Sequence, residues 1–138
     1  MDRKYHLTFG QLIDRLCIVT LKSIKIPKNK ETYEQEAQEI MHDLDLIVKE
    51  KKISMTGQMV RAIIVNAIAN ETIWQNESEA RKGNKDQDKL LKFTHSVNGV
   101  RNNAVNVISQ EIGERKDLKL DCLAAEICKE RGYDWDVL

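Results

Sequence analysis

The sequence contains little that would break or cross-link a chain. One proline and six glycines occur among its 138 residues, which favours long helices over strands joined by tight turns. The three cysteines are an odd count without C-x-x-C spacing, which argues against a disulfide framework and a structural zinc site. No apolar run approaches the roughly 20 residues that span a bilayer, so we expect no membrane segment.

The chain also lacks an excess of either charge. Its 22 basic and 22 acidic side chains cancel, whereas proteins that coat nucleic acid usually carry a basic excess. No apolar stretch of the signal-peptide type follows the first residues. These features predict a protein of a reducing cytoplasm that binds neither membrane nor nucleic acid, and they do not distinguish a bacterial cytoplasm from that of a phage-infected cell. The length fits one domain over residues 1–138.

The apolar periodicity predicts an all-α fold, an antiparallel bundle of about five helices. A capping box at Thr8 and Gln11 should begin the first helix, which ends at Pro27. Further helices are predicted at about 32–51, 56–81, 86–110 and 119–131. Gly83 and Gly113 stand where helix C-termini are expected. The tail around Trp135 should pack back on the bundle.

Apolar residues mark the expected core. The first helix has a wide apolar surface that extends to Ile24, and the second has a clean stripe of Tyr33, Ala37, Ile40, Leu44 and Ile47. The nearly seven-residue rhythm of this stripe would also suit a seam between two chains, so a homo-oligomer is one hypothesis. The apolar part of the third helix consists of Met59, Val60, Ile63, Ile64, Ala67 and Ile68.

Three helices carry polar residues on faces that begin as core, when each is projected at about 100° per residue. On the third helix the line of Met59 and Ile63 continues into Asn66, Asn70, Trp74, Glu77 and Arg81. On the fourth, Arg101 interrupts an apolar line beside His95 and Asn98; on the first, Arg15 and Lys22 share a line beside Asp14. Because buried charges must be paired, we expect Arg101 to pair with Glu77 and Asp14 with a basic residue.

These polar residues have two interpretations: an ionic network that sets helix register, or a cavity that binds a ligand. Arginine can donate two hydrogen bonds to phosphate or carboxylate oxygens. Asparagine can hydrogen-bond to amides and hydroxyls, and tryptophan can stack on a flat ring. The ligand hypothesis predicts a small phosphorylated or nucleotide-like molecule, held without metal, cofactor or catalytic residue. Its binding residues would be Arg15, Lys22, Asn70, Trp74, Glu77, Arg81, His95, Asn98 and Arg101.

Three segments carry a family resemblance. Residues 12–22, 70–81 and 97–102 resemble the signatures L-I-D-R-L-S-I-x-x-L-K, N-x-x-[IL]-W-x-x-E-x-x-x-R and N-x-x-R of a family of uncharacterised small helical proteins from bacteria and tailed phages. Cys17 departs from the usual serine. The resemblance implies an all-helical fold but no established activity. In a phage setting, it would fit a protein that sequesters a host immune signalling nucleotide.

Two alternatives belong to other functional classes. Glu36 and Glu39 resemble the first half of the magnesium-binding pattern of all-α nucleoside triphosphate pyrophosphatases, and Asp43 could add a third carboxylate. The second E-x-x-D pair of those hydrolases is missing. Glu39-x-x-His42 occurs once where di-iron proteins use two such motifs, so we interpret it as a solvated helix face. The remaining alternative is a structural adaptor that acts through its helical faces.

Overall fold

The described residues of the computed structural model are 7–83, 87–114, 134–135 and 137–138. They form four α-helices, and a short 3₁₀ turn η1 (Pro27–Asn29) joins the first two. The helices are α1 (Phe9–Lys25), α2 (Lys30–Lys51), α3 (Gly57–Lys82) and α4 (Gln87–Glu111). No strand occurs in these ranges, which confirms the predicted all-α class. The fifth helix, predicted at 119–131, lies outside the described residues.

Local sequence signals set the helix ends. The Thr8 hydroxyl accepts a hydrogen bond from Gln11 N at 3.2 Å, and the Gln11 side chain accepts one from Thr8 N at 2.9 Å. This confirms the predicted capping box. At its C-terminal end, α3 stops at Gly83, whose φ of 68° is a left-handed conformation that glycine adopts without strain. Helix α2 begins slightly before its predicted start because the turn at Pro27 leads directly into it.

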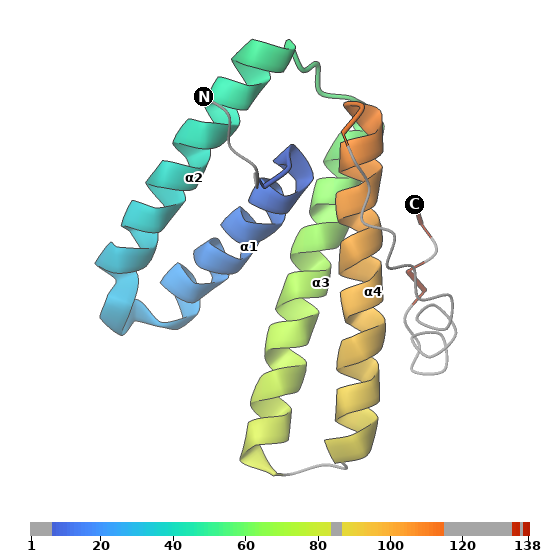
Figure 1. The fold of residues 1–138 in the computed structure, drawn as a ribbon. Helices are drawn as coiled ribbons and strands as arrows, with labels where there is room; N and C mark the ends of the chain where they lie inside the picture. The colour runs from blue at the N-terminus through green and yellow to red at the C-terminus, as the bar shows by residue number, and fades with distance from the viewer. Residues whose placement is uncertain (1–6, 84–86, 115–133, 136) are drawn as a thin grey trace.

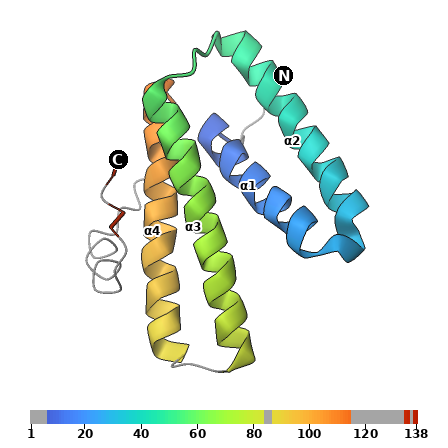
Figure 2. The same ribbon diagram turned by 180° about the vertical axis from the view of Figure 1, so that it is seen from behind.

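The helices form two antiparallel hairpins, α1 with α2 and α3 with α4 (Figure 1). Helix α1 packs against α2 on one side and against α3 and α4 on the other. The backbone of α2 comes close to α1 but to neither α3 nor α4, so the hairpins splay apart, as both views show (Figures 1 and 2). The arrangement matches the predicted antiparallel bundle only roughly, because α2 packs against α1 alone among the helices and lies away from α3 and α4.

The core consists of three apolar clusters. One lies between α3 and α4, a second where the start of α1 meets those helices, and a third between α1 and α2. The stripe on α2 packs in the third cluster, so its rhythm serves an internal contact with α1. Trp135 packs against the first cluster, which confirms the expected return of the tail. None of the described helices is long and apolar enough to cross a membrane.

Two expectations about the core were wrong. On α3, Val60, Ile64 and Ile68 are exposed at 44%, 52% and 50%, and the buried face carries Ala62 and Ala69 among others. Ile24, at the end of α1, is 71% exposed. The physical reason is the angle between the hairpins: since α2 leans away from α3, no described element covers these side chains.

Three helix ends meet at Glu114. Its Oε1 accepts a hydrogen bond from Phe9 N at 2.8 Å, and its Oε2 lies 3.1 Å from Lys51 Nζ. A carboxylate at a helix N-terminus both satisfies a free backbone N–H and interacts favourably with the helix dipole. This mostly buried side chain therefore ties the start of α1 and the end of α2 to the segment after α4.

Candidate functional site

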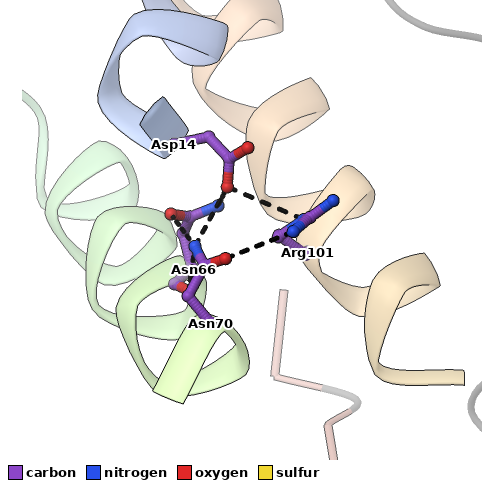
Figure 3. Close-up of polar contacts among 4 residues, drawn as sticks. All are labelled: Asp14, Asn66, Asn70 and Arg101. Carbon is purple, nitrogen blue, oxygen red and sulfur yellow. Dashed lines mark hydrogen bonds and ion pairs between the residues drawn. The ribbon is translucent and has the colours of Figure 1, made fainter. Parts of the chain in front are cut away.

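A polar network joins α1, α3 and α4 where α1 crosses the other two helices (Figure 3). Asp14 Oδ1 accepts hydrogen bonds from the side-chain amides of Asn66 and Asn70, both at 3.0 Å. Arg101 Nη1 donates to Asn70 Oδ1 at 3.3 Å, and Arg101 Nε lies 3.7 Å from Asp14 Oδ1. The side chains of Asp14 and Arg101 are 20% and 26% exposed, so the ion pair lies at the edge of the core.

The helical repeat explains how the network forms. Asn66 and Asn70 are one turn apart on the buried face of α3, and Asn70 Nδ2 also lies 3.1 Å from Asn66 Oδ1. A buried amide is costly without a partner, and a buried carboxylate more so. Here two amides donate to a single carboxylate oxygen and one guanidinium lies beside it, although Arg101 Nε itself has no hydrogen-bond partner among the described residues. The arrangement is that of a structural network directed inward.

The predicted pairing of Arg101 was wrong. We expected Glu77 as its partner, but Glu77 is exposed and Arg101 pairs with Asp14. The expectation that Asp14 has a basic partner is therefore met by Arg101 itself. The error arose because projection of a single helix gives the direction of a side chain but not the height at which a neighbouring helix crosses. Helix α1 reaches the α3–α4 pair at the level of Asn66 and Asn70.

The structure disperses most of the nine predicted ligand-binding residues. Only Asn70 and Arg101 contact each other through a hydrogen bond. Arg15 is exposed and pairs with Glu36 of α2 at 3.3 Å, while Lys22 Nζ lies 5.9 Å from the centre of the Tyr33 ring. Trp74 and Asn98 are half-buried, and the exposed remainder consists of Glu77, Arg81 and His95.

An apolar groove is the feature that sequence reasoning missed. It encloses about 470 Å³ between α1, α2 and α3. Helix α1 provides most of its surface, Leu44 belongs to α2, Met55 to the following loop, and Ile63 and Ala67 to α3. The remaining lining residues are Phe9, Ile13, Leu16, Cys17, Thr20 and Leu21. No charged residue lines the groove.

Exposed apolar side chains continue the groove outward. On α3, Val60, Ile64 and Ile68 form a row next to the groove residues Ile63 and Ala67, because residues four apart align on a helix. On α2, Met41 and Val48 lie three and four residues from Leu44 and are more than a third exposed. Exposed apolar side chains grouped in this way are typical of interaction surfaces. Its sequence signal was present, but it was interpreted as core.

The thiol of Cys17 lies in this groove. Burial, and secondarily the negative charge of Asp14, raise its pKa from 9.0 to about 11. The protonated thiol is the poorer nucleophile, so Cys17 behaves as a small apolar residue at neutral pH.

The carboxylates suggested for a hydrolase do not form a site. Glu36 faces Arg15, while Glu39 and Asp43 are exposed and His42 contacts Asp43 at 3.4 Å. Within the part of the chain that the structure describes, no group of three His, Cys, Asp or Glu side chains could hold a metal ion. The metal-dependent hydrolase alternative thus has no geometric support among these residues.

An ion pair fastens the end of α1 to α3. Lys25 Nζ lies 2.9 Å from Glu71 Oε1. Partial burial alone would raise the pKa of Glu71, but hydrogen bonds from Lys25 and Gln75 and the Lys25 charge lower it below its ordinary value of 4.5. A carboxyl with a lowered folded-state pKa stabilises the fold above its unfolded pKa, and this contribution disappears as the pH falls through the folded-state value.

Replacing Lys25 should therefore have a small, pH-dependent effect. We expect Lys25→Met to lower the free energy of unfolding at pH 7 by less than about 1 kcal/mol, because the pair is partly exposed. The difference between wild type and variant should be smaller at pH 3 than at pH 7, because the charge interaction disappears as the pH falls through the lowered pKa of Glu71. Urea unfolding at both pH values measures it. A difference that is the same at both would show that the lysine stem, and not its charge, makes the contribution.

Comparisons with models of protein families, with characterised proteins and with solved structures found no match to this chain. The resemblance to a bacterial and phage family stays a prediction from the sequence motifs. The geometry of the groove and the network is therefore the basis for a functional proposal.

Proposed function

We propose that this chain is a protein-interaction module, an adaptor, whose groove between α1, α2 and α3 binds an amphipathic helix. The observation that carries the proposal is a groove of about 470 Å³ with an apolar lining, continued by the exposed row of Val60, Ile64 and Ile68. Water contact with this much apolar surface is unfavourable, and burial by a partner would remove it. The apolar row also continues the contact surface along α3 beyond the groove itself.

A helix suits the chemistry of this groove. The backbone hydrogen bonds of a helix are satisfied internally, so a partner helix needs no hydrogen bonds from the groove. It binds through apolar side chains spaced three and four residues apart. The lining provides such contact almost everywhere. Thr20, Cys17 and Met55 are its only polar or sulfur-bearing side chains, and they offer no charge that could orient a phosphorylated molecule.

The nucleotide-binding hypothesis, with its sequestering role in a phage-infected cell, has weaker support. Phosphate recognition needs cationic side chains that converge on one point. Arg101 is engaged by Asp14 and Asn70, Arg15 by Glu36, and Arg81 is exposed elsewhere on α3. The network therefore favours the structural interpretation, in which it sets where α1 crosses α3 and α4.

The proposal predicts that peptides can occupy the groove. Helical peptides would be selected against the full chain from a library of randomised amphipathic sequences, and their affinities measured by fluorescence anisotropy. We expect Ala67→Arg to weaken binding at least about tenfold, because a long charged side chain would fill an apolar site. Ala67 is exposed on α3 and lines the groove, so this change leaves the core intact.

The matched control is Leu91→Glu. Leu91 is an exposed apolar residue of α4 that does not line the groove, and its substitution should leave peptide affinity unchanged. Peptides that bind Ala67→Arg as tightly as wild type would contradict the proposal. For protein that is monomeric at the assay concentration, binding confined to small apolar dyes, with no peptide selected, would also contradict it.

A further inference from the structure

We infer that the helix that fills the groove is α3 of a second copy of this chain, so that the protein forms a two-fold symmetric dimer. This inference rests on the proposed function and identifies the partner for the same groove. In the dimer, the row of Val60, Ile64 and Ile68 of each copy packs into the groove of the other.

The groove and the apolar row lie side by side, as a symmetric interface requires. In a two-fold dimer the same surface patch occurs on both copies, and each part must meet its complement on the other. Ile63 and Ala67 form one wall of the groove, and the exposed row is the adjacent row of the same helix. A rotation that inserts the row of one copy into the groove of its partner inserts the partner's row reciprocally. Ala67, being small, lets the two α3 helices approach at the centre.

The charge distribution also suits a second copy. The chain has no net charge, so two copies do not repel one another over distance. The exposed Arg61 borders the apolar row on α3, and the exposed Asp45 lies one turn after Met41 on α2. An antiparallel pairing of the α3 helices brings Arg61 of one copy towards α2 of the other. Opposite charges at the rim of an interface favour this pairing over others.

Sedimentation equilibrium of the full chain over a range of concentrations tests the inference. We expect wild type to have the mass of a dimer. Ile64→Glu should raise the dissociation constant at least about a hundredfold, because each substitution occurs twice in a symmetric interface. Ile64 is 52% exposed, so the variant should fold, which circular dichroism checks. A second variant, Arg61→Glu, should weaken the dimer, and Asp45→Arg added to it should restore association.

Leu91→Glu is again the control, since Leu91 is 58% exposed and lies on α4. It should leave the dimer intact. A wild type that is monomeric throughout, or a dimer that Ile64→Glu does not weaken, would overturn the inference. The peptide assay separates this failure from that of the proposed function. A monomeric wild type that binds helical peptides and loses them in Ala67→Arg would refute the dimer while leaving the groove a helix-binding site.

Discussion

Asp14→Ala is expected to lower the free energy of unfolding by about 3 kcal/mol, the lower end of the range for removing one partner of a buried ion pair. The substitution removes the acceptor of the Asn66 and Asn70 amides and the charge that balances Arg101. The estimate is at the lower end because the Asp14 and Arg101 side chains keep 20% and 26% exposure. Urea unfolding followed by circular dichroism measures the loss.

The exposed pair of Arg15 and Glu36 offers a matched control. Glu36→Ala removes a carboxylate that also accepts from an arginine, at 3.3 Å, but in a more exposed setting. Its cost should stay below about 1 kcal/mol. Equal losses in the two variants would contradict a structural role for the network.

A double-mutant cycle isolates the ionic part of the Asp14 effect. In an Arg101→Met background, Asp14→Ala no longer leaves a guanidinium unpaired at the edge of the core, so its cost should be smaller. The residual cost would reflect the two asparagine amides. If the cost were unchanged in this background, Arg101 would contribute nothing through Asp14, and the 3.7 Å separation would have no energetic consequence.

The sequence predicted those features that depend on neighbours along the chain. The capping box at Thr8 and the left-handed glycine at Gly83 are local, since their partners lie within a few residues. The apolar stripe on α2 was also predictable, because one period describes the whole helix and one partner, α1, covers it. Projection likewise placed Asn70 and Arg101 on inward faces, where the structure has them.

The groove could not be predicted because it depends on the angle between hairpins. Helix α3 carries apolar residues on two faces, and its sequence does not distinguish the face that α4 covers from the face left exposed. Ala62 and Ala69 point to the interior, whereas the larger Ile64 and Ile68 are exposed. An apolar residue that stays exposed on α3 and one that is buried in the core have the same hydropathy. Only the position of α2 separates them, and that position is a tertiary property.

The same limit applies to the predicted ligand site. Arg15, Glu77, Arg81 and His95 were grouped because each lies on or beside a polar line of its own helix. The structure leaves these four side chains exposed, and places α1 across only part of the α3–α4 surface. Side chains that point inward from different helices meet only if the helices cross at the level of those side chains. Periodicity within one helix contains no information on crossing points.

Gly10→Ala should destabilise the fold by about 1–3 kcal/mol, although alanine is the better helix former. A Cβ added at Gly10 would lie 2.8 Å from the backbone oxygen of Val105 and 3.0 Å from Ser109 Oγ. The backbone of α4 cannot rotate away as a flexible side chain would, so α1 must shift outward. That shift would also strain the contact between Asp14 and Arg101, one turn further along α1.

Gly57→Ala is the opposing control, because both glycines lie at the start of a helix. An added Cβ at Gly57 meets nothing within 4 Å, so alanine there should stabilise the chain by up to about 1 kcal/mol through its lower conformational entropy in the unfolded state. Thermal or urea unfolding of the two variants should therefore give effects of opposite sign. If both stabilised the protein, α1 would not approach α4 at Gly10 as closely as the structure has it. The crossing that places Asp14 beside Asn66 and Asn70 would then need to be revised as well.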